Sequence, residues 1–179
     1  MFRKNLSRIL NIGLLVVFIL FSGFKNYQTY DTNARIKAVF IYNFAKYIQW
    51  PSNYKDGPFI IGVFGESNVL KELNKMAKMK KINNRPLKVV QYKDIADIEK
   101  CHILYVPKKY SDEFNAINKK LKSQSTVVIT ENEGLLDKGA GINFVVINNR
   151  QKFEINKTLL KKKKLKVSND LDKLAVRIK

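Results

Sequence analysis

The sequence is poor in the residues from which most small metal sites are built. Among 179 residues there is one cysteine, Cys101, and one histidine, His102. A single cysteine excludes an intrachain disulfide framework and a cysteine-based zinc cluster, and a single histidine excludes a multi-histidine metal site. With 8 glycines and 4 prolines, the chain is neither fibrous nor a flexible linker. We therefore expect no metal and no other cofactor.

Negative charge is also scarce. Only 15 aspartates and glutamates stand against 34 lysines and arginines, which gives a formal net charge of +19. This balance favours anionic neighbours. However, only six of the basic residues are arginine, the residue best suited to bind phosphates and guanine edges through two hydrogen bonds. Abundant lysine, asparagine and isoleucine are also typical of an AT-rich genome. We do not expect nucleic acid as a partner, because the N-terminus predicts export and nucleic acids are scarce outside the cytoplasm.

The first 23 residues have the layout of a secretory signal peptide. Arg3, Lys4 and Arg8 are positive, and residues 9–21 are almost entirely apolar. As a helix these thirteen residues would span about 20 Å, less than the roughly 30 Å of a hydrocarbon core. We expect export to the periplasm and cleavage near Gly23, with residues 24–179 as one domain. An uncleaved membrane anchor is the alternative.

Apolar runs alternate with helical patterns along the rest of the chain, as in an α/β domain. The predicted strands are residues 59–64, 87–91, 101–106, 126–130 and 142–147. The predicted helices are residues 32–49, capped by Thr32 or Asn33, then 69–79, and 112–121, capped by Ser111. We expect a single Rossmann-like domain in which helices flank a mainly parallel sheet.

The C-terminal third has a different pattern. Asn148 and Asn149 predict a hairpin turn, after which residues 152–155 return antiparallel to residues 142–147. A short helix is expected near Thr158. Ser168 is predicted to cap a last helix with apolar residues at helical spacing, namely Leu171, Leu174, Ala175 and Ile178.

The predicted first helix is apolar on two faces, which is more than one sheet requires. We assign to the sheet the stripe formed by Ile36, Val39, Phe40, Phe44, Tyr47 and Ile48. The second face carries Ala38, Ile41, Tyr42 and Ala45.

Tyr42, Lys46 and Trp50 follow one another at intervals of four residues beside this second face. Residues four apart are neighbours on a helix, so the three predict a row along the helix and its exit. An aromatic–cation–aromatic row offers area and one charge but no acid–base pair, which favours a protein interface over catalysis. Core packing under the last helix is the alternative.

Other candidate groups give no catalytic residue. Cys101 and His102 are adjacent on a predicted strand, so their side chains point to opposite faces and cannot form a dyad. Glu131 and Glu133 follow a predicted strand end, where open α/β sheets place ligands, although solvated loop acids are the alternative. The four lysines of residues 161–164 indicate either a solvated helix end or attraction to anionic lipid.

Residues 37–51 (KAVFIYNFAKYIQWP) resemble the opening signature of the YfiR family of exported proteins. The resemblance covers nearly all of residues 34–179, in order. Its further segments are 61–65 (IGVFG), 101–105 (CHILY), 130–133 (TENE), 141–144 (GINF), 153–156 (FEIN) and 165–168 (LKVS).

The resemblance implies a periplasmic α/β domain that is a regulator and not an enzyme. YfiR proteins hold the sensor region of an inner-membrane diguanylate cyclase inactive, and their release raises cyclic di-GMP and promotes biofilm formation. The family also occurs beside sensor kinases. We expect Tyr42, Lys46 and Trp50 to bind such a partner, with Glu131 and Glu133 as additions.

Three further points are left open by the sequence. The alternative function is that of a periplasmic small-molecule-binding component of a signalling or uptake system. The sequence is compatible with a homodimer, and its charge with weak contact to an anionic membrane surface.

Overall fold

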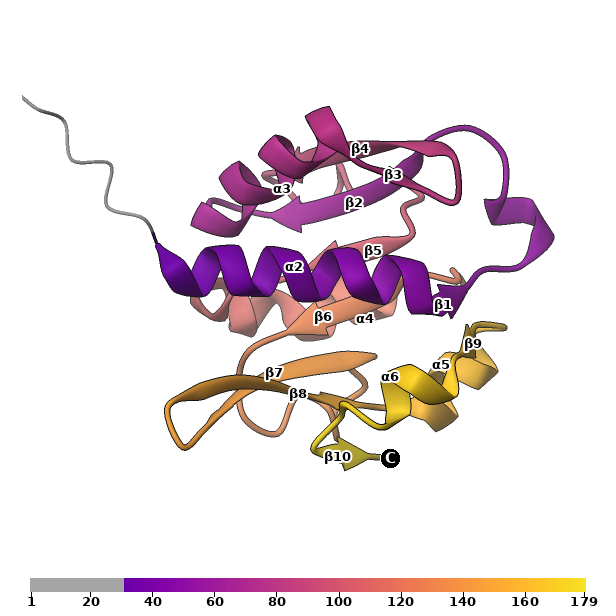
Figure 1. Cartoon of the computed structure of the whole chain (residues 1–179). Helices are drawn as coiled ribbons and strands as arrows, with labels where there is room; N and C mark the ends of the chain where they lie inside the picture. Colours follow the sequence, from indigo (N-terminus) through magenta and orange to yellow (C-terminus); the bar gives the residue numbers. More distant parts are fainter. Residues whose placement is uncertain (1–30) are drawn as a thin grey trace, which may run out of the picture. The chain divides into compact units, whose positions relative to one another are not determined.

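The computed structural model describes residues 31–179, so the predicted signal peptide, residues 1–23, lies outside the described residues. At the centre of the domain is a mixed, mostly parallel sheet of eight strands in the order β10-β8-β7-β6-β5-β2-β4-β3 (Figure 1). Its strands are β2 (Phe59–Phe64), β3 (Lys81–Ile82), β4 (Arg85–Tyr92), β5 (Ile103–Tyr105), β6 (Val127–Thr130), β7 (Ile142–Ile147), β8 (Arg150–Ile155) and β10 (Arg177–Ile178). The predicted α/β class is confirmed.

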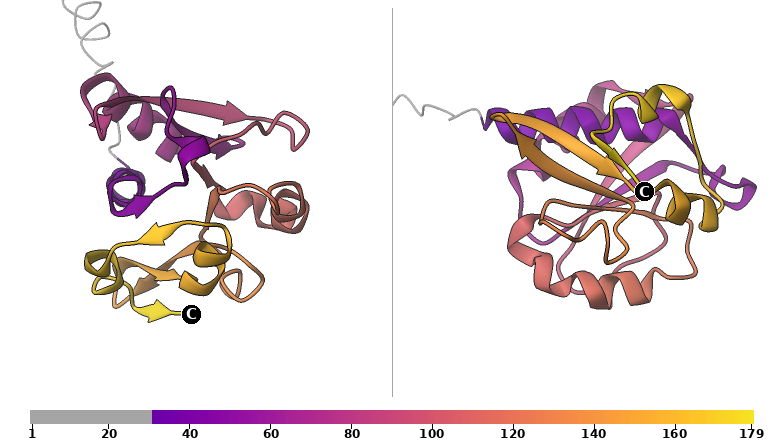
Figure 2. Two further views of the ribbon diagram at one scale, coloured as in Figure 1. Left: turned by 90° about the vertical axis from the view of Figure 1, so that its right-hand side faces the viewer. Right: turned by 90° about the horizontal axis from the view of Figure 1, so that it is seen from below.

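Helices flank the sheet on both faces (Figure 2). The α-helices are α2 (Thr32–Tyr47), α3 (Asn68–Met79), α4 (Phe114–Lys120), α5 (Lys157–Lys162) and α6 (Asn169–Asp172). Two 3₁₀ segments, η1 (Ser52–Tyr54) and η2 (Lys108–Glu113), precede β2 and α4. A separate two-stranded sheet pairs β1 (Ile48–Gln49) with β9 (Lys166–Val167) in antiparallel orientation.

The three central strands, β2, β5 and β6, are continuous runs of mostly apolar residues. Strand β5 lies between β2 and β6 and pairs with both in parallel, with Ile103 opposite Ile61 on one side and Val127 on the other. All residues of β5 and β6 are buried, as are five of the six in β2. Because helices cover both faces, these strands need apolar side chains at every position rather than at alternate ones.

The core is divided into two clusters by the sheet. On one face α2 and α3 pack on the strands, and the rings of Phe44 and Phe153 meet edge to face with centroids 4.9 Å apart. On the other face α4 contributes Phe114 and Ile117, and this cluster also holds Cys101. The left view of Figure 2 shows α2 and α4 on opposite sides of the sheet.

The antiparallel hairpin near the C-terminus is confirmed. Strands β7 and β8 pair in antiparallel register from Ile142 opposite Ile155 to Ile147 opposite Arg150. Asn148 and Asn149 form the turn with φ values of 50° and 58°, in the left-handed region that asparagine tolerates.

Two helix-capping predictions were wrong. Helix α2 begins at Thr32, and its cap is Asp31, whose carboxylate accepts a hydrogen bond from the Ala34 amide. Ser111 does not cap α4 but lies inside η2, where its hydroxyl donates to the carbonyl of Lys108. Because η2 continues to Glu113, α4 begins only at Phe114, and Ser111 lies two residues before the cap position of the helix.

The predicted last helix ends much earlier than its apolar spacing suggests. Ser168 does cap α6, but the helix ends at Asp172, and Leu174 and Ile178 are 58% and 50% exposed. Instead, Arg177 and Ile178 form β10, which pairs in parallel with the edge of β8. The amides of Val176 and Lys179, on either side of β10, donate to the carbonyls of Phe153 and Ile155 on β8. This pairing competes with continuation of the helix.

Candidate functional site

Helix α2 buries a different face from the one that the sequence suggested. Its buried residues are Ala34, Ala38, Ile41, Phe44 and Ala45. Of the stripe assigned to the sheet, Phe44 and Ile48 are buried, whereas Ile36, Val39 and Tyr47 are 37%, 42% and 37% exposed. The three small alanines let the helix backbone lie close to its neighbours, which is the packing that selects this face. The outward face of α2, defined here as Ile36, Val39 and Tyr47, is therefore an apolar stripe open to solvent.

Tyr42 and Lys46 lie together at the border between α2 and β3. The half-buried Tyr42 donates a hydrogen bond from its hydroxyl to the carbonyl of Lys81, with an O···O distance of 3.2 Å. The ammonium nitrogens of Lys46 and Lys80 lie 6.0 and 5.7 Å from the centroid of the Tyr42 ring. Two cations beside one aromatic ring make this border positive and aromatic.

Trp50 does not continue this row on the surface. Helix α2 ends at Tyr47, and the chain then turns into the short strand β1, so the spacing of four residues no longer places side chains on one helix face. Trp50 is only 8% exposed. Its ring meets Phe59 at 5.0 Å and His102 at 5.6 Å between centroids, in edge-to-face contacts. Within the described residues, Trp50 is therefore a core residue at the exit of α2.

His102 holds the segment before β2 in place. Its Nδ1 accepts a hydrogen bond from the Ile60 amide at 3.0 Å, so the proton of the neutral ring is on Nε2, which lies 2.8 Å from the Tyr54 carbonyl. Burial is the main reason that the pKa of His102 is lowered to about 4, and the Arg85 guanidinium adds to the effect. The ring is thus neutral at pH 7 and structural.

Cys101 is fully buried on the opposite side of the sheet from α2. Burial raises the pKa of its thiol to about 12, so almost no thiolate exists at neutral pH. Cys101 and His102 thus serve separate parts of the core, and neither is placed as a nucleophile or a base.

Glu131 lies at the carboxyl end of β6 in a partly buried polar cluster. The Lys37 ammonium and the Tyr105 hydroxyl both donate to its carboxylate. Burial, together with the charge of Glu131, raises the pKa of Tyr105, so this hydroxyl stays protonated and remains a donor. The cluster ties α2, β5 and the loop after β6 to one another at this edge of the sheet.

Glu133 is exposed and lines a cavity of about 730 Å³ at the same edge. Glu131 lines this cavity too, so the structure brings the two predicted acids together. Cations line it as well, among them Lys37, Lys108 and Arg177. With Asp137 and Glu154 also in the lining, four acids and three cations surround the cavity.

Sequence reasoning missed Lys37 and Tyr105 in this cluster. One feature of the sequence indicated the place of Tyr105. It is the last residue of an apolar strand, and the carboxyl ends of parallel strands meet at one edge of the sheet, where Glu131 also lies. The outward exposure of Ile36, Val39 and Tyr47 had no signal in the sequence, because both faces of the helix are apolar.

Within residues 31–179 there is no group of three or more histidine, cysteine, aspartate or glutamate side chains that could hold a metal ion. Among the same residues no helix is long and apolar enough to cross a membrane.

Comparison with known proteins agrees with the motifs quoted above. No curated protein matches the chain. The profile of the YfiR/HmsC-like family matches residues 34–176, which is most of the chain and nearly all of the described domain. The chain therefore belongs to the YfiR/HmsC-like family of regulators.

Proposed function

We propose that this protein is an exported, non-enzymatic regulator that binds the sensor region of an inner-membrane signalling protein and holds it inactive. The observation that carries the proposal is the family match over residues 34–176. Within the family, the partner is a diguanylate cyclase or a sensor kinase, and the consequence of release from a cyclase is a rise in cyclic di-GMP and more biofilm.

The outward face of α2 is the surface that fits such a partner best. Ile36, Val39 and Tyr47 are large apolar side chains that remain about 40% exposed on a well-formed helix. Apolar and aromatic side chains on a rigid element are the usual centre of a protein interface, and charged residues form its rim. Tyr42 and Lys46 supply that rim on one side.

The predicted site is therefore proposed in a revised form. Tyr42 and Lys46 stay in the interface, whereas Trp50 supports the exit of α2 from within the core. Glu131 and Glu133 lie at the carboxyl edge of the sheet, where Lys37 links Glu131 to α2. A partner that covers α2 also reaches this edge along the same helix.

The functional test is made in cells that carry the cognate membrane sensor. Deletion of the gene is expected to raise cyclic di-GMP when the partner is a cyclase, or phosphorylation of the response regulator when it is a kinase. The exported protein is also expected to co-purify with the detergent-solubilised sensor. Unchanged output together with no co-purification would reject the proposal.

A second candidate function is that of a periplasmic small-molecule-binding component. The cavity of about 730 Å³ at the carboxyl edge favours it, because open α/β sheets bind ligands at this edge. Its lining of acids and cations suits a small ligand that itself bears both charges. Thermal-shift screening with zwitterionic metabolites tests this function, and Glu131→Gln should abolish any shift that depends on the cavity.

A further inference from the structure

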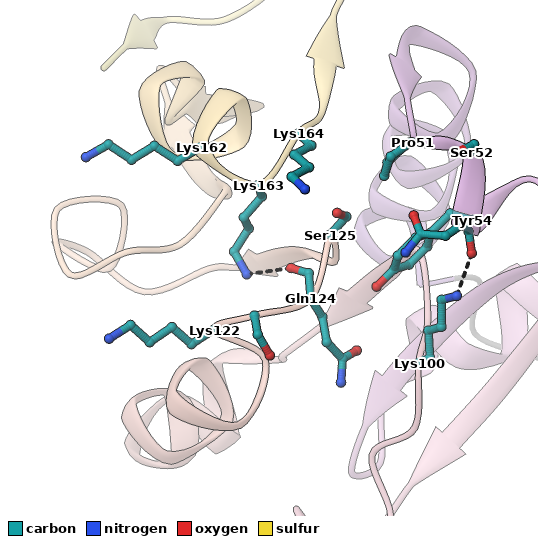
Figure 3. A pocket seen from close by; sticks show the side chains of 12 residues that line it. Pro51, Ser52, Tyr54, Lys100, Lys122, Gln124, Ser125, Lys162, Lys163 and Lys164 are labelled. Carbon is teal, nitrogen blue, oxygen red and sulfur yellow. Dashed lines mark hydrogen bonds between the residues drawn. The ribbon is translucent and has the colours of Figure 1, made fainter.

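A second cavity, of about 790 Å³, lies at the opposite, amino edge of the parallel strands. Five lysines line it, and no aspartate or glutamate does (Figure 3). They come from three separate parts of the chain: Lys100 before β5, Lys122 after α4, and Lys162, Lys163 and Lys164 at the end of α5. The remaining lining is mostly polar, formed by Pro51, Ser52, Asn53, Tyr54, Ser123, Gln124 and Ser125.

Nothing in the described domain neutralises these five charges. None of the five lysines forms an ion pair with an acidic side chain of residues 31–179, although the domain contains seven such pairs elsewhere. Bringing like charges together around one cavity costs free energy. The arrangement is most stable when an anion from outside the chain occupies it.

Two of the lysines are held in place by the backbone rather than by acids. The Lys163 ammonium donates to the carbonyls of Leu121 and Gln124 at 2.8 and 3.0 Å, which leaves one of its three protons without a partner among these contacts. Burial lowers the pKa of Lys163. The Lys100 ammonium donates to the Asn53 carbonyl and lies 4.4 Å from the centroid of the Tyr54 ring. Both cations are thus pre-positioned before any ligand arrives.

Lys164 occupies a position that normally favours glycine. It follows α5 with φ of 61°, while its amide donates to the Lys161 carbonyl and the Leu165 amide donates to the Leu160 carbonyl. This is the Schellman ending of a helix, in which glycine avoids the steric cost of the left-handed residue. A lysine here costs backbone energy, and Figure 3 shows its side chain directed toward Ser125 from the end of α5.

We infer that this lysine cavity binds a small phosphate-bearing polyanion. The volume lies within the range of ligand sites, and a lining rich in ammonium and hydroxyl groups suits several phosphate oxygens. The phosphate comes either from a free metabolite or from the headgroup of an anionic lipid. The lysine cavity is separate from the outward face of α2. The inference about anion binding therefore does not depend on the proposed partner.

The test uses the full-length exported protein and two variants of equal charge. Lys122→Gln combined with Lys164→Gln removes two cations from the cavity. Lys78→Gln combined with Lys88→Gln removes two exposed cations elsewhere, on α3 and β4. Binding of pyrophosphate and tripolyphosphate is measured by calorimetry at constant ionic strength. Binding to vesicles of phosphatidylglycerol, with phosphatidylcholine as reference, forms a second arm.

We expect the cavity variant to weaken binding by about tenfold or more, because it removes two charge-assisted contacts, while the control variant changes it less than about twofold. Loss in the polyphosphate arm identifies a soluble ligand, and loss in the vesicle arm alone identifies a lipid headgroup. Equal losses in both variants, or no binding in either arm, would overturn the inference.

A single variant separates a binding role from a structural one. Lys164→Gly removes both the charge and the strained backbone, so it is expected to raise the melting temperature by about 1–3 °C while it weakens anion binding. If Lys164 were only a helix end, the melting temperature would change and anion binding would stay as in the unchanged protein.

Discussion

The two faces of helix α2 differ in what covers them and not in how apolar they are. The inner face, with Ala38, Ile41 and Phe44, is fully buried against the sheet and its neighbours. The outer face, with Ile36, Val39 and Tyr47, is about 40% exposed in the described domain. Equal hydrophobicity with unequal burial teaches that the helix serves two purposes. One face stabilises the fold, and we propose that the other binds a partner.

The largest expected effect comes from the inner face. Phe44→Ala removes a ring that packs on Phe40, Phe144 and Phe153 within 6.0 Å between centroids. We expect a loss of about 3–5 kcal/mol in the free energy of unfolding, the usual cost of such a cavity. Urea denaturation followed by circular dichroism measures it. A loss below about 1 kcal/mol would show that the inner face is not the structural one.

Thiol labelling compares the interior with the outer face directly. Cys101 is fully buried and its thiol pKa is raised to about 12, so a thiol reagent should modify it at least about 100-fold more slowly in native protein than in urea. A cysteine introduced as Val39→Cys in a Cys101→Ser background should react at nearly the unfolded rate. Similar labelling rates at positions 101 and 39 would show that the outer face of α2 is no more accessible than the interior.

The exit of α2 has a pH dependence that the outer face lacks. His102 has an unfolded pKa of 6.5 and a folded pKa of about 4, so the unfolded chain takes up a proton between these values that the folded chain does not. The contribution of the neutral His102 ring to the free energy of unfolding is therefore fully present above pH 6.5, and it decreases as the pH falls toward 4.

We expect a loss of roughly 1–2 kcal/mol between pH 7.5 and 5, after allowing for solvent around the ring. His102→Gln should remove most of this slope in urea titrations at the two pH values. The lowered carboxyl pKa values of Asp31 and Asp137 act only below about pH 4 and do not interfere. An unchanged slope in the variant would mean that His102 is not the titrating group.

The smallest effect on stability is expected on the outer face. Ile36→Gln and Val39→Gln introduce a better helix former and remove only partly exposed apolar surface. Each should change the free energy of unfolding by about 0.5 kcal/mol or less in the isolated protein. Thermal denaturation checks this, and a loss of 2 kcal/mol would show that the face is covered within the protein.

The sequence was sufficient for the central strands because each of them is a continuous apolar run between turn residues. Strands β2 and β7 begin and end at the predicted residues, and the Asn148–Asn149 turn forms as expected. Predictions were wrong where two physical solutions compete. The segment around Ser111 could form either the first turn of α4 or the 3₁₀ segment η2, and the segment from Leu174 to Ile178 could either continue a helix or pair with the edge of β8.

The candidate site was less predictable for a related reason. Periodicity shows that α2 has two apolar faces, but which one is buried depends on the shape of the neighbouring elements. Trp50 follows the strand β1, which begins where α2 ends. A spacing of four residues from Lys46 therefore does not place Trp50 on the same helix face. The grouping of Lys100 and Lys122 with the lysines at the end of α5 depends on chain topology, which residue spacing does not encode.

The most direct test of the outer face as the partner surface is a titration of the purified sensor region with two matched variants. Val39→Gln combined with Tyr47→Gln alters the outer face, whereas Val146→Gln combined with Leu174→Gln removes apolar side chains that are 68% and 58% exposed elsewhere. We predict that the first variant weakens binding at least about tenfold, as loss of central interface residues does, with its melting temperature within a few degrees of the original. The second should bind normally. Normal binding by the first variant, or equal weakening by both, would contradict the assignment of the partner surface to α2.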